Sequence, residues 1–411
     1  MKKVIRILAV ILVMTTLFSL CACAGSGSKK VEIKFMVCEY SKNTEEYMNQ
    51  IIADFEKDHP DVKINLEMVS WDDASTRVST LITGKQAPDI LNIDSYSQYL
   101  EDGLLLPITD YVNEDSLSAY YPDFLAYNVA SDGKSYALPF VASVRNLYYN
   151  KDIFDEVGIA AAPATWDELK ADCQLIKDHY NGAVAPMGMD FTTNEGQANF
   201  SYYAWNFGGG WVDDNDNYTL NSAANVEALD YMVGLYKDGL TNQNPLTETR
   251  DDMQGMMNEG KLAMMFSACF FPALYPDLNL GIASIPSNGG QASIQLGVQD
   301  RVMVFDNDYS DTKLQAISDF VAYLLSCGTY ADWCLKEGLL PVTTSAMETL
   351  IAKDDIYNTF NEALQSVKFY PSYLVDWTDA KNAVIEAVQA VASGSKDAQT
   401  ALDDAQAAIA G

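Results

Sequence analysis

The chain has 411 residues, with 26 Lys and Arg against 57 Asp and Glu and a formal net charge of −31 at pH 7. So large an acidic excess argues against nucleic acid and anionic lipid as partners. Only two histidines are present, so a histidine-dependent triad or metal site has almost no residues to draw on, and we expect neither a metal nor a cofactor.

The N-terminus has the pattern of a bacterial lipoprotein signal. Three cations among the first six residues precede an apolar run over 7–20, which is too short to span a bilayer and is typical of a signal peptide. Leu20-Cys-Ala-Cys23 follows and fits a lipobox, with Cys23 preferred to Cys21 because a small residue precedes it. The alternative is a plain secretory signal with incidental cysteines.

Cleavage before Cys23 would remove residues 1–22 and leave a mature chain of 389 residues. Because the signal carries three cations and no anions, 23 Lys and Arg would remain against 57 Asp and Glu, a net charge of −34. Residues 23–30 would form the lipid-anchored tether to the membrane, since Ala24–Lys30 has the composition of a flexible linker. The rest is long enough for two lobes, each with its own core.

The first part of the mature chain reads as a βαβαβ unit. Alternating or continuous apolar patterns predict strands over 31–37, 62–68 and 89–93, with helices over 47–55 and 71–83 between them. This order predicts an α/β lobe with a largely parallel sheet. Ligands bind such sheets beyond the carboxyl ends of the strands, where Glu39, Tyr40 and Asp94 follow.

Residues 134–169 contain two β-type runs, Tyr136–Phe140 and Leu147–Tyr149, and then two helix starts. A short helix over 152–157 is predicted to stop at Gly158, and Thr165 has capping-box spacing to Glu168. Longer helical stretches, two of them Ala-rich, and further strands follow. They comprise helices over 223–237, 250–258, 314–326, 379–392 and 396–409, and strands after 260 and over 282–286 and 297–305.

Three motifs in order, GK-x-YALPF at 133–140, YYNKD-x-F at 148–154 and P-x-TWDEL at 163–169, give a more specific signal. Together they resemble the first crossover of the extracellular sugar-binding proteins of ABC importers, the solute-binding family that includes maltose-binding protein. GK-x-AM at 260–264, IP at 285–286 and G-x-LP at 338–341 recur in the same order. The resemblance covers nearly the whole mature chain.

The resemblance implies a two-lobed periplasmic-binding-protein-like α/β fold, each lobe a mostly parallel sheet flanked by helices, with a hinged cleft between them. Carried over, the first lobe comprises 31–138 plus 297–342 and the second 139–296 plus 343–411. It implies a monomeric, membrane-anchored binding protein, not an enzyme, that closes on a carbohydrate and delivers it to the permease subunits of an ABC transporter.

A sugar site needs flat aromatic platforms and planar polar side chains, because a sugar ring has apolar C–H faces and a rim of hydroxyls. The resemblance places Asp94 at a hydroxyl acceptor, and Phe270 and Trp377 at stacking positions. Ser143 replaces an acidic ligand and Asn199 a stacking tyrosine, so the ligand should differ from maltose. The predicted ligand-binding set is Glu39, Tyr40, Asp94, Ser143, Arg145, Asn199, Trp205, Trp211, Ser267, Phe270, Asp300, Arg301 and Trp377.

Arg145 and Arg301 lie near the predicted crossings between lobes. Their planar donors could hold a hydroxyl pair or a uronate carboxylate, or local carboxylates could hold them instead. For each of the tryptophans, a role in the core is the alternative to ligand stacking.

Other functions have weaker support. Gly208–Gly210 lacks the Lys-Ser/Thr of a phosphate loop, and the acidic turn after Asp213 lacks the Gly and Glu of a calcium loop. A secreted glycoside hydrolase, a cell-surface adhesion module and a binder of another small polar solute stay as alternatives.

Overall fold

The computed structural model describes residues 30–130 and 132–409; the expected signal peptide and Cys23 lie outside these ranges. Within the described ranges, no helix has both the length and the hydropathy needed to cross a bilayer.

The N-terminal segment forms the predicted βαβαβ unit. Its strands are buried at alternating or at all positions. Ser70 is the N-cap of α3, because its side chain accepts a hydrogen bond from the backbone N–H of Asp73. The elements are β1 (Val31–Cys38), α2 (Thr44–Asp58), β2 (Val62–Val69), α3 (Trp71–Thr83) and β3 (Ile90–Ile93). Short helices follow: α4 (Ser97–Glu101), the 3₁₀ turn η1 (Ile108–Asp110), α5 (Glu114–Leu117) and α6 (Pro122–Ala126).

The two β-type runs around residue 140 are the two ends of one long strand, β4 (Ala137–Asn150). The strand passes Pro139 through a shift in register between Pro139 and Val141, which accommodates the missing backbone donor. Helix α7 (Lys151–Val157) ends at Gly158 with φ 82°, and α8 (Trp166–Tyr180) begins with the Thr165–Glu168 capping box. Both helix signals are therefore confirmed.

The middle of the chain builds the helix-rich half of the molecule. Trp205 lies in the last turn of a helix there, beside the loop that follows. The elements are β5 (Ala185–Gly188), α9 (Gly196–Asn206), α10 (Ala223–Lys237), α11 (Arg250–Asn258), β6 (Leu262–Ala268), α12 (Phe271–Leu274) and β7 (Leu280–Ala283).

The last third returns to the first half and then crosses again. Its elements are β8 (Gln295–Val304), α13 (Asp311–Leu324), α14 (Gly328–Glu337), β9 (Leu340–Pro341), α15 (Thr344–Ile351), α16 (Ile356–Ala363), η2 (Leu364–Ser366), β10 (Val367–Lys368), α17 (Trp377–Ala392) and α18 (Ala398–Ile409).

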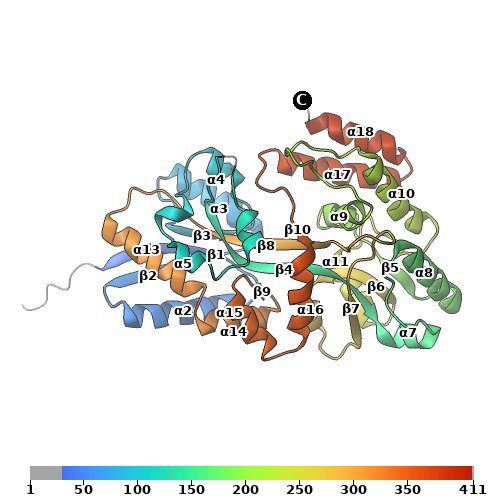
Figure 1. Ribbon diagram of the computed structural model, residues 1–411, viewed down its shortest axis with the longest axis horizontal. Coiled ribbons are helices and arrows are strands. Elements are labelled where there is room, and N and C mark those ends of the chain that lie inside the picture. Colours follow the sequence, from blue (N-terminus) through green and yellow to red (C-terminus); the bar gives the residue numbers. More distant parts are fainter. Residues whose placement is uncertain (1–29, 131, 410–411) are drawn as a thin grey trace, which may run out of the picture.

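All ten strands of the described ranges belong to one hydrogen-bonded sheet, with the order β2-β1-β3-β8-β4-β6-β5 along its main path. Pairing is parallel among β1, β2 and β3 and between β5 and β6, whereas β4 and β8 pair antiparallel with each other. These two strands run across the middle of the molecule and join its two helix-flanked halves (Figure 1). The result is the expected two-lobed α/β architecture, joined by long strands.

The buried hydrophobic side chains form two large, separate cores. Leu169, Trp211 and Val388 belong to the core of the second lobe. The core around β1 and α2 also takes in Met347 of α15 and Phe360 of α16. The same core includes Met257 of α11 and Met265 of β6, so it extends across the junction between the lobes.

Candidate functional site

The site is organised by the two crossing strands. In the antiparallel register, Ser143 lies opposite Val298, Val141 opposite Asp300 and Pro139 opposite Arg301, and on the other side Arg145 lies opposite Ala268. Pairing of β4 with β6 also sets Asn146 opposite Ser267. Residues from distant parts of the sequence are thus brought together where the lobes meet.

Tyr40, after β1, and Asp300, on β8, lie close together on the first-lobe side. The Tyr40 hydroxyl accepts a hydrogen bond from the Asn92 side chain at 3.2 Å, and its ring packs edge-on against Trp333. Burial, and then the nearby Asp94, raise the pKa of Asp300 to about 7. Burial, and then the nearby Asp300, likewise raise the pKa of Tyr40 above its usual range. The surroundings of Tyr40 and Asp300 therefore disfavour further negative charge.

Arg301 is almost fully buried, and protein oxygens occupy its donors. Its Nε donates to the Asn128 side chain at 2.6 Å, and Nη1 donates to the backbone carbonyl of Asp94. Nη2 reaches the Ser372 hydroxyl at 3.3 Å, and the guanidinium lies over the ring of Tyr96. Arg301 therefore ties β8 to the loop after β3 and to the segment after β10.

Arg145 is held by an ion pair across the second lobe. One nitrogen donates to Glu195 at 3.2 Å and another to the Ser143 hydroxyl at 2.9 Å. Arg250 shares the same Glu195 carboxylate oxygen at 2.5 Å and lies over the ring of Phe270. One carboxylate thus fixes two arginines, and Ser143 and Phe270 are engaged by the same network.

Two further predicted residues have local partners in the second lobe. The Asn199 side chain donates to the backbone carbonyl of Glu195 one helical turn earlier, at 3.2 Å. The Ser267 hydroxyl accepts from Gln254 at 2.9 Å and is fully buried. Glu39 is exposed directly after β1.

A cavity of about 160 Å³ lies beside this polar network, between the lobes. Asp94, Arg301 and Trp377, all predicted, line it, together with residues that the sequence did not single out. The full lining is Asp94, Ser95, Tyr127, Gln197, Gly297, Val298, Gln299, Arg301, Phe369, Tyr370, Ser372, Trp377 and Lys381.

Three buried polar atoms in this lining have no hydrogen-bond partner: Gln197 Oε1, Gln299 Nε2 and the Tyr127 hydroxyl. An unpaired buried donor or acceptor costs about 1–3 kcal/mol. Gln197 and Gln299 together present an acceptor and a donor, which is what a sugar hydroxyl can satisfy, because a hydroxyl both donates and accepts.

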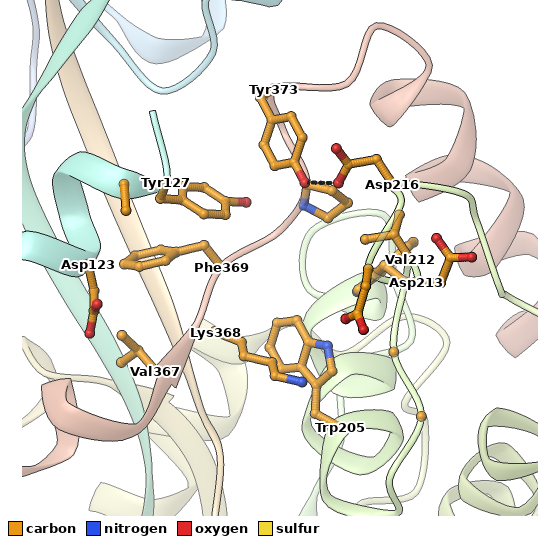
Figure 2. A pocket seen from close by; sticks show the side chains of 16 residues that line it. Asp123, Tyr127, Trp205, Val212, Asp213, Asp216, Val367, Lys368, Phe369 and Tyr373 are labelled. Carbon is orange, nitrogen blue, oxygen red and sulfur yellow. Dashed lines mark hydrogen bonds between the residues drawn. The ribbon is translucent and has the colours of Figure 1, made fainter. Parts of the chain in front are cut away.

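A larger cavity of about 490 Å³ adjoins the first and shares Tyr127 and Phe369 with it. Figure 2 shows these two rings on one side, Trp205 below, and Val212, Asp213 and Asp216 on the opposite side. The two rings lie 4.6 Å apart between centroids, and the Tyr373 hydroxyl donates to Asp216 at 2.5 Å across the top. Four aspartates and one lysine line this cavity: Asp123, Asp213, Asp214, Asp216 and Lys368.

The predicted tryptophans differ in what they can offer a ligand. Trp377 is partly exposed, stacks on Tyr370 with centroids 5.0 Å apart, and lines the smaller cavity. Trp205 and Trp211 line the larger cavity, but both are buried, and the Trp211 indole donates to Ser201 within the core. Trp377 is therefore the most available platform of the three.

Eight of the thirteen predicted residues line neither cavity: Glu39, Tyr40, Ser143, Arg145, Asn199, Ser267, Phe270 and Asp300. The residues that sequence reasoning missed are the two glutamines and the aromatic run Phe369-Tyr-Pro-Ser-Tyr373. Three aromatic residues so close together before a helix could have indicated a ligand-binding surface from the sequence alone. The two glutamines had no such signal, because only the packing of strands and helices reveals that each amide has one buried atom without a partner.

The described residues contain no group of three or more His, Cys, Asp or Glu placed to hold a metal ion. The five cysteines within them are free, and all but Cys327 are buried. What the arrangement can do is bind: it offers rings, amides and carboxylates between two lobes.

A cleft between two lobes that share crossing strands defines a solute-binding protein. This chain belongs to the bacterial extracellular solute-binding protein family, whose sequence profile matches residues 41–328. Family membership places it outside the cytoplasm.

Related proteins align with most of this chain. The chain is 29% identical over 391 residues to a protein of Brucella abortus (strain 2308) named as a binding protein, covering 93% of each. It is 27% identical over 351 residues to the sn-glycerol-3-phosphate-binding periplasmic protein of the same strain, covering 78% of this chain and 79% of that protein. The cyclic alpha-maltosyl-1,6-maltose binding protein from Arthrobacter globiformis has the same fold, with a TM-score of 0.80 at 21% identity, covering 92% and 98% of the two chains.

Proposed function

We propose that this protein is the substrate-binding lipoprotein of an ABC importer and that it captures an uncharged oligosaccharide in the two adjoining cavities. The observation that carries the proposal is the pair of amides of Gln197 and Gln299, each with one buried atom that has no hydrogen-bond partner, in a cavity walled by Tyr370 and Trp377. Ring faces match the apolar faces of a sugar, and the amides match its hydroxyls.

Electrostatics favour an uncharged sugar over a phosphorylated one. Four aspartates face the larger cavity against one lysine, and Asp94 and Asp300 lie on the first-lobe side of the smaller one. The buried arginines offset little of this charge for a ligand, because Arg145 is paired with Glu195 and protein oxygens accept from Arg301. A phosphate would therefore meet net repulsion in the larger cavity, where four aspartates outnumber Lys368, and only part of this would be offset by Lys381 in the smaller one.

A screen of thermal stability tests this choice. Neutral mono- and oligosaccharides are compared with sn-glycerol 3-phosphate, since a ligand at 100 times its Kd adds about 2.7 kcal/mol of stability. We expect a neutral oligosaccharide to raise the melting temperature and sn-glycerol 3-phosphate to leave it unchanged. Stabilisation by the phosphate alone would contradict the proposal.

Hinge bending between the lobes would release the sugar to the permease. The lobes we propose are 31–138 plus 297–342 and 139–296 plus 343–411. Strands β4 and β8 carry the bending. Solution scattering should give a smaller radius of gyration with sugar than without it, and an unchanged radius despite binding would contradict hinge closure.

A glycoside hydrolase is the second candidate, favoured by the raised pKa of Asp300 beside Asp94. Two carboxyl groups in unlike environments are a feature of hydrolases that use a general acid. Incubation of the bound oligosaccharide with the protein, followed by chromatography, decides between the two. Recovery of intact sugar supports binding, and shorter products would support hydrolysis.

Anchoring is proposed through a lipid on Cys23, with the mature protein a monomer on the outer face of the cell membrane. Cys23→Ala should abolish incorporation of labelled palmitate, while the neighbouring Cys21→Ala serves as the matched control and should retain it. Labelling of Cys23→Ala at the wild-type level would contradict the lipobox.

A further inference from the structure

A separate cavity of about 240 Å³ lies in the first lobe, away from the two cavities of the cleft. It is enclosed by the segment that contains η1 and α5, by the second half of α13, by Leu138 of β4 and by Thr343. Figure 1 shows α5 beside α13. Its lining is Tyr111, Val112, Asn113, Ser116, Ala119, Tyr120, Leu138, Ser318, Val321, Ala322, Tyr323, Leu325, Ser326 and Thr343.

No Asp, Glu, Lys or Arg is present in this lining, although a fifth of the chain is charged. By contrast, the lining of each of four other cavities in the described ranges contains at least two charged side chains. Nothing in the wall could compensate a buried charge, and burying one without a partner is very costly. The cavity therefore suits an uncharged molecule.

Two hydroxyls in the lining have no hydrogen-bond partner. Tyr111 and Thr343 are each 3% exposed, and neither side-chain oxygen is bonded. Burial also raises the pKa of Tyr111, so its hydroxyl stays protonated and can donate. Buried hydroxyls are normally satisfied, so two unpaired ones beside the same space indicate that a polar group can be accepted there.

We propose that this cavity is a second binding site, which takes a small uncharged molecule with an apolar body and one hydrogen-bonding group. Val321, Leu325 and Leu138 contact the apolar body, while Tyr111 and Thr343 contact the polar group. The volume is sufficient, because an apolar cavity of about 150 Å³ already binds benzene in another protein. The site is distinct from the sugar cleft and does not depend on the proposed function.

Benzyl alcohol and toluene make a matched pair of probes, since they share a ring and differ in the hydroxyl. Binding to the mature protein is followed by ligand-observed NMR and by calorimetry. We expect saturable binding of benzyl alcohol in the millimolar range and weaker binding of toluene. Absence of saturable benzyl alcohol binding would overturn the proposal.

Variants then locate the probe. Ala322→Phe, at an exposed position of α13 that lines the cavity, should abolish binding, while Ala171→Phe, at an exposed position of α8, is the matched control and should not. The pair Tyr111→Phe and Thr343→Val should weaken benzyl alcohol about tenfold and leave toluene unchanged, as expected for lost hydrogen bonds. Equal binding by Ala322→Phe, or an unchanged preference for the alcohol in the hydroxyl variants, would contradict this site.

Discussion

The arginine network and the small cavity beside it are both polar and both lie where the lobes meet, but they differ in how their groups are satisfied. In the network, Glu195 pairs with Arg145 and Arg250, and protein oxygens surround Arg301. In the cavity, the amides of Gln197 and Gln299 each leave one atom unpaired. Charges here stabilise the junction between lobes, whereas neutral amides and aromatic rings are left free for a ligand.

The largest effect should follow from breaking the network. Glu195→Ala leaves the buried Arg145 guanidinium without its carboxylate and leaves the partly exposed Arg250 with Asp251 alone. Loss of one partner from a buried ion pair costs about 3–5 kcal/mol. Denaturant unfolding measures this change. Glu67→Ala, which removes the exposed pair with Arg77, is the control and should cost roughly 0–1 kcal/mol. Equal costs for the two variants would contradict the stabilising role of the network.

The raised pKa of Asp300 should make the stability of the folded protein depend on pH. Its pKa is raised from 3.8 to about 7, so between these values the folded protein binds more protons at this site than the unfolded chain does. Stability contributed by this group is therefore present below about pH 4 and is lost as pH rises through about 7.

Asp300→Asn should remove that decline. Compared with wild type, the variant should gain stability at pH 8 by at most about 4 kcal/mol, since one pKa unit corresponds to 1.36 kcal/mol. Urea unfolding at pH 5 and at pH 8 measures the difference. Parallel pH profiles for the two proteins would show that Asp300 titrates normally.

Trp377 should matter to binding rather than to folding. Trp377→Ala removes the partly exposed ring that lines the small cavity and should weaken sugar binding by roughly 1–3 kcal/mol. Val375→Ala, two residues earlier with an exposed side chain, is the control and should bind like wild type. Calorimetry with the sugar found in the screen provides the measurement. Unchanged affinity in Trp377→Ala would assign the ring to lobe packing with Tyr370.

Much of the fold could be predicted from the sequence, because its signals are local. Alternating apolar residues gave the strands of the first lobe, and Gly158 and the Thr165 capping box gave two helix boundaries. The single long strand β4 was harder to see, since Pro139 interrupts its pattern and only pairing with β8 shows the bulge.

The site could be predicted only in part. Asp94 and Trp377 were placed by the family resemblance and Arg301 by its position near a predicted crossing, and all three line a cavity between the lobes. The partner of Arg145 lies 50 residues away on another element, so its ion pair leaves no local trace in the sequence. Gln197 and Gln299 are ordinary residue types, and their missing partners become visible only when the whole surroundings are known.

The most direct test of the account is the sugar affinity and stability of Gln299→Leu. Leucine fills similar space but cannot donate, so affinity should fall by about 0.5–1.5 kcal/mol, roughly tenfold at most. The unfolding free energy should change little, because removal of the unpaired Nε2 offsets loss of the 3.4 Å bond that Oε1 accepts from Asn128. Gln254→Leu is the contrasting control, since its amide already donates to Ser267 and its loss should lower stability. Wild-type affinity with reduced stability in Gln299→Leu would contradict the claim that the unpaired amides of the cleft recognise the ligand.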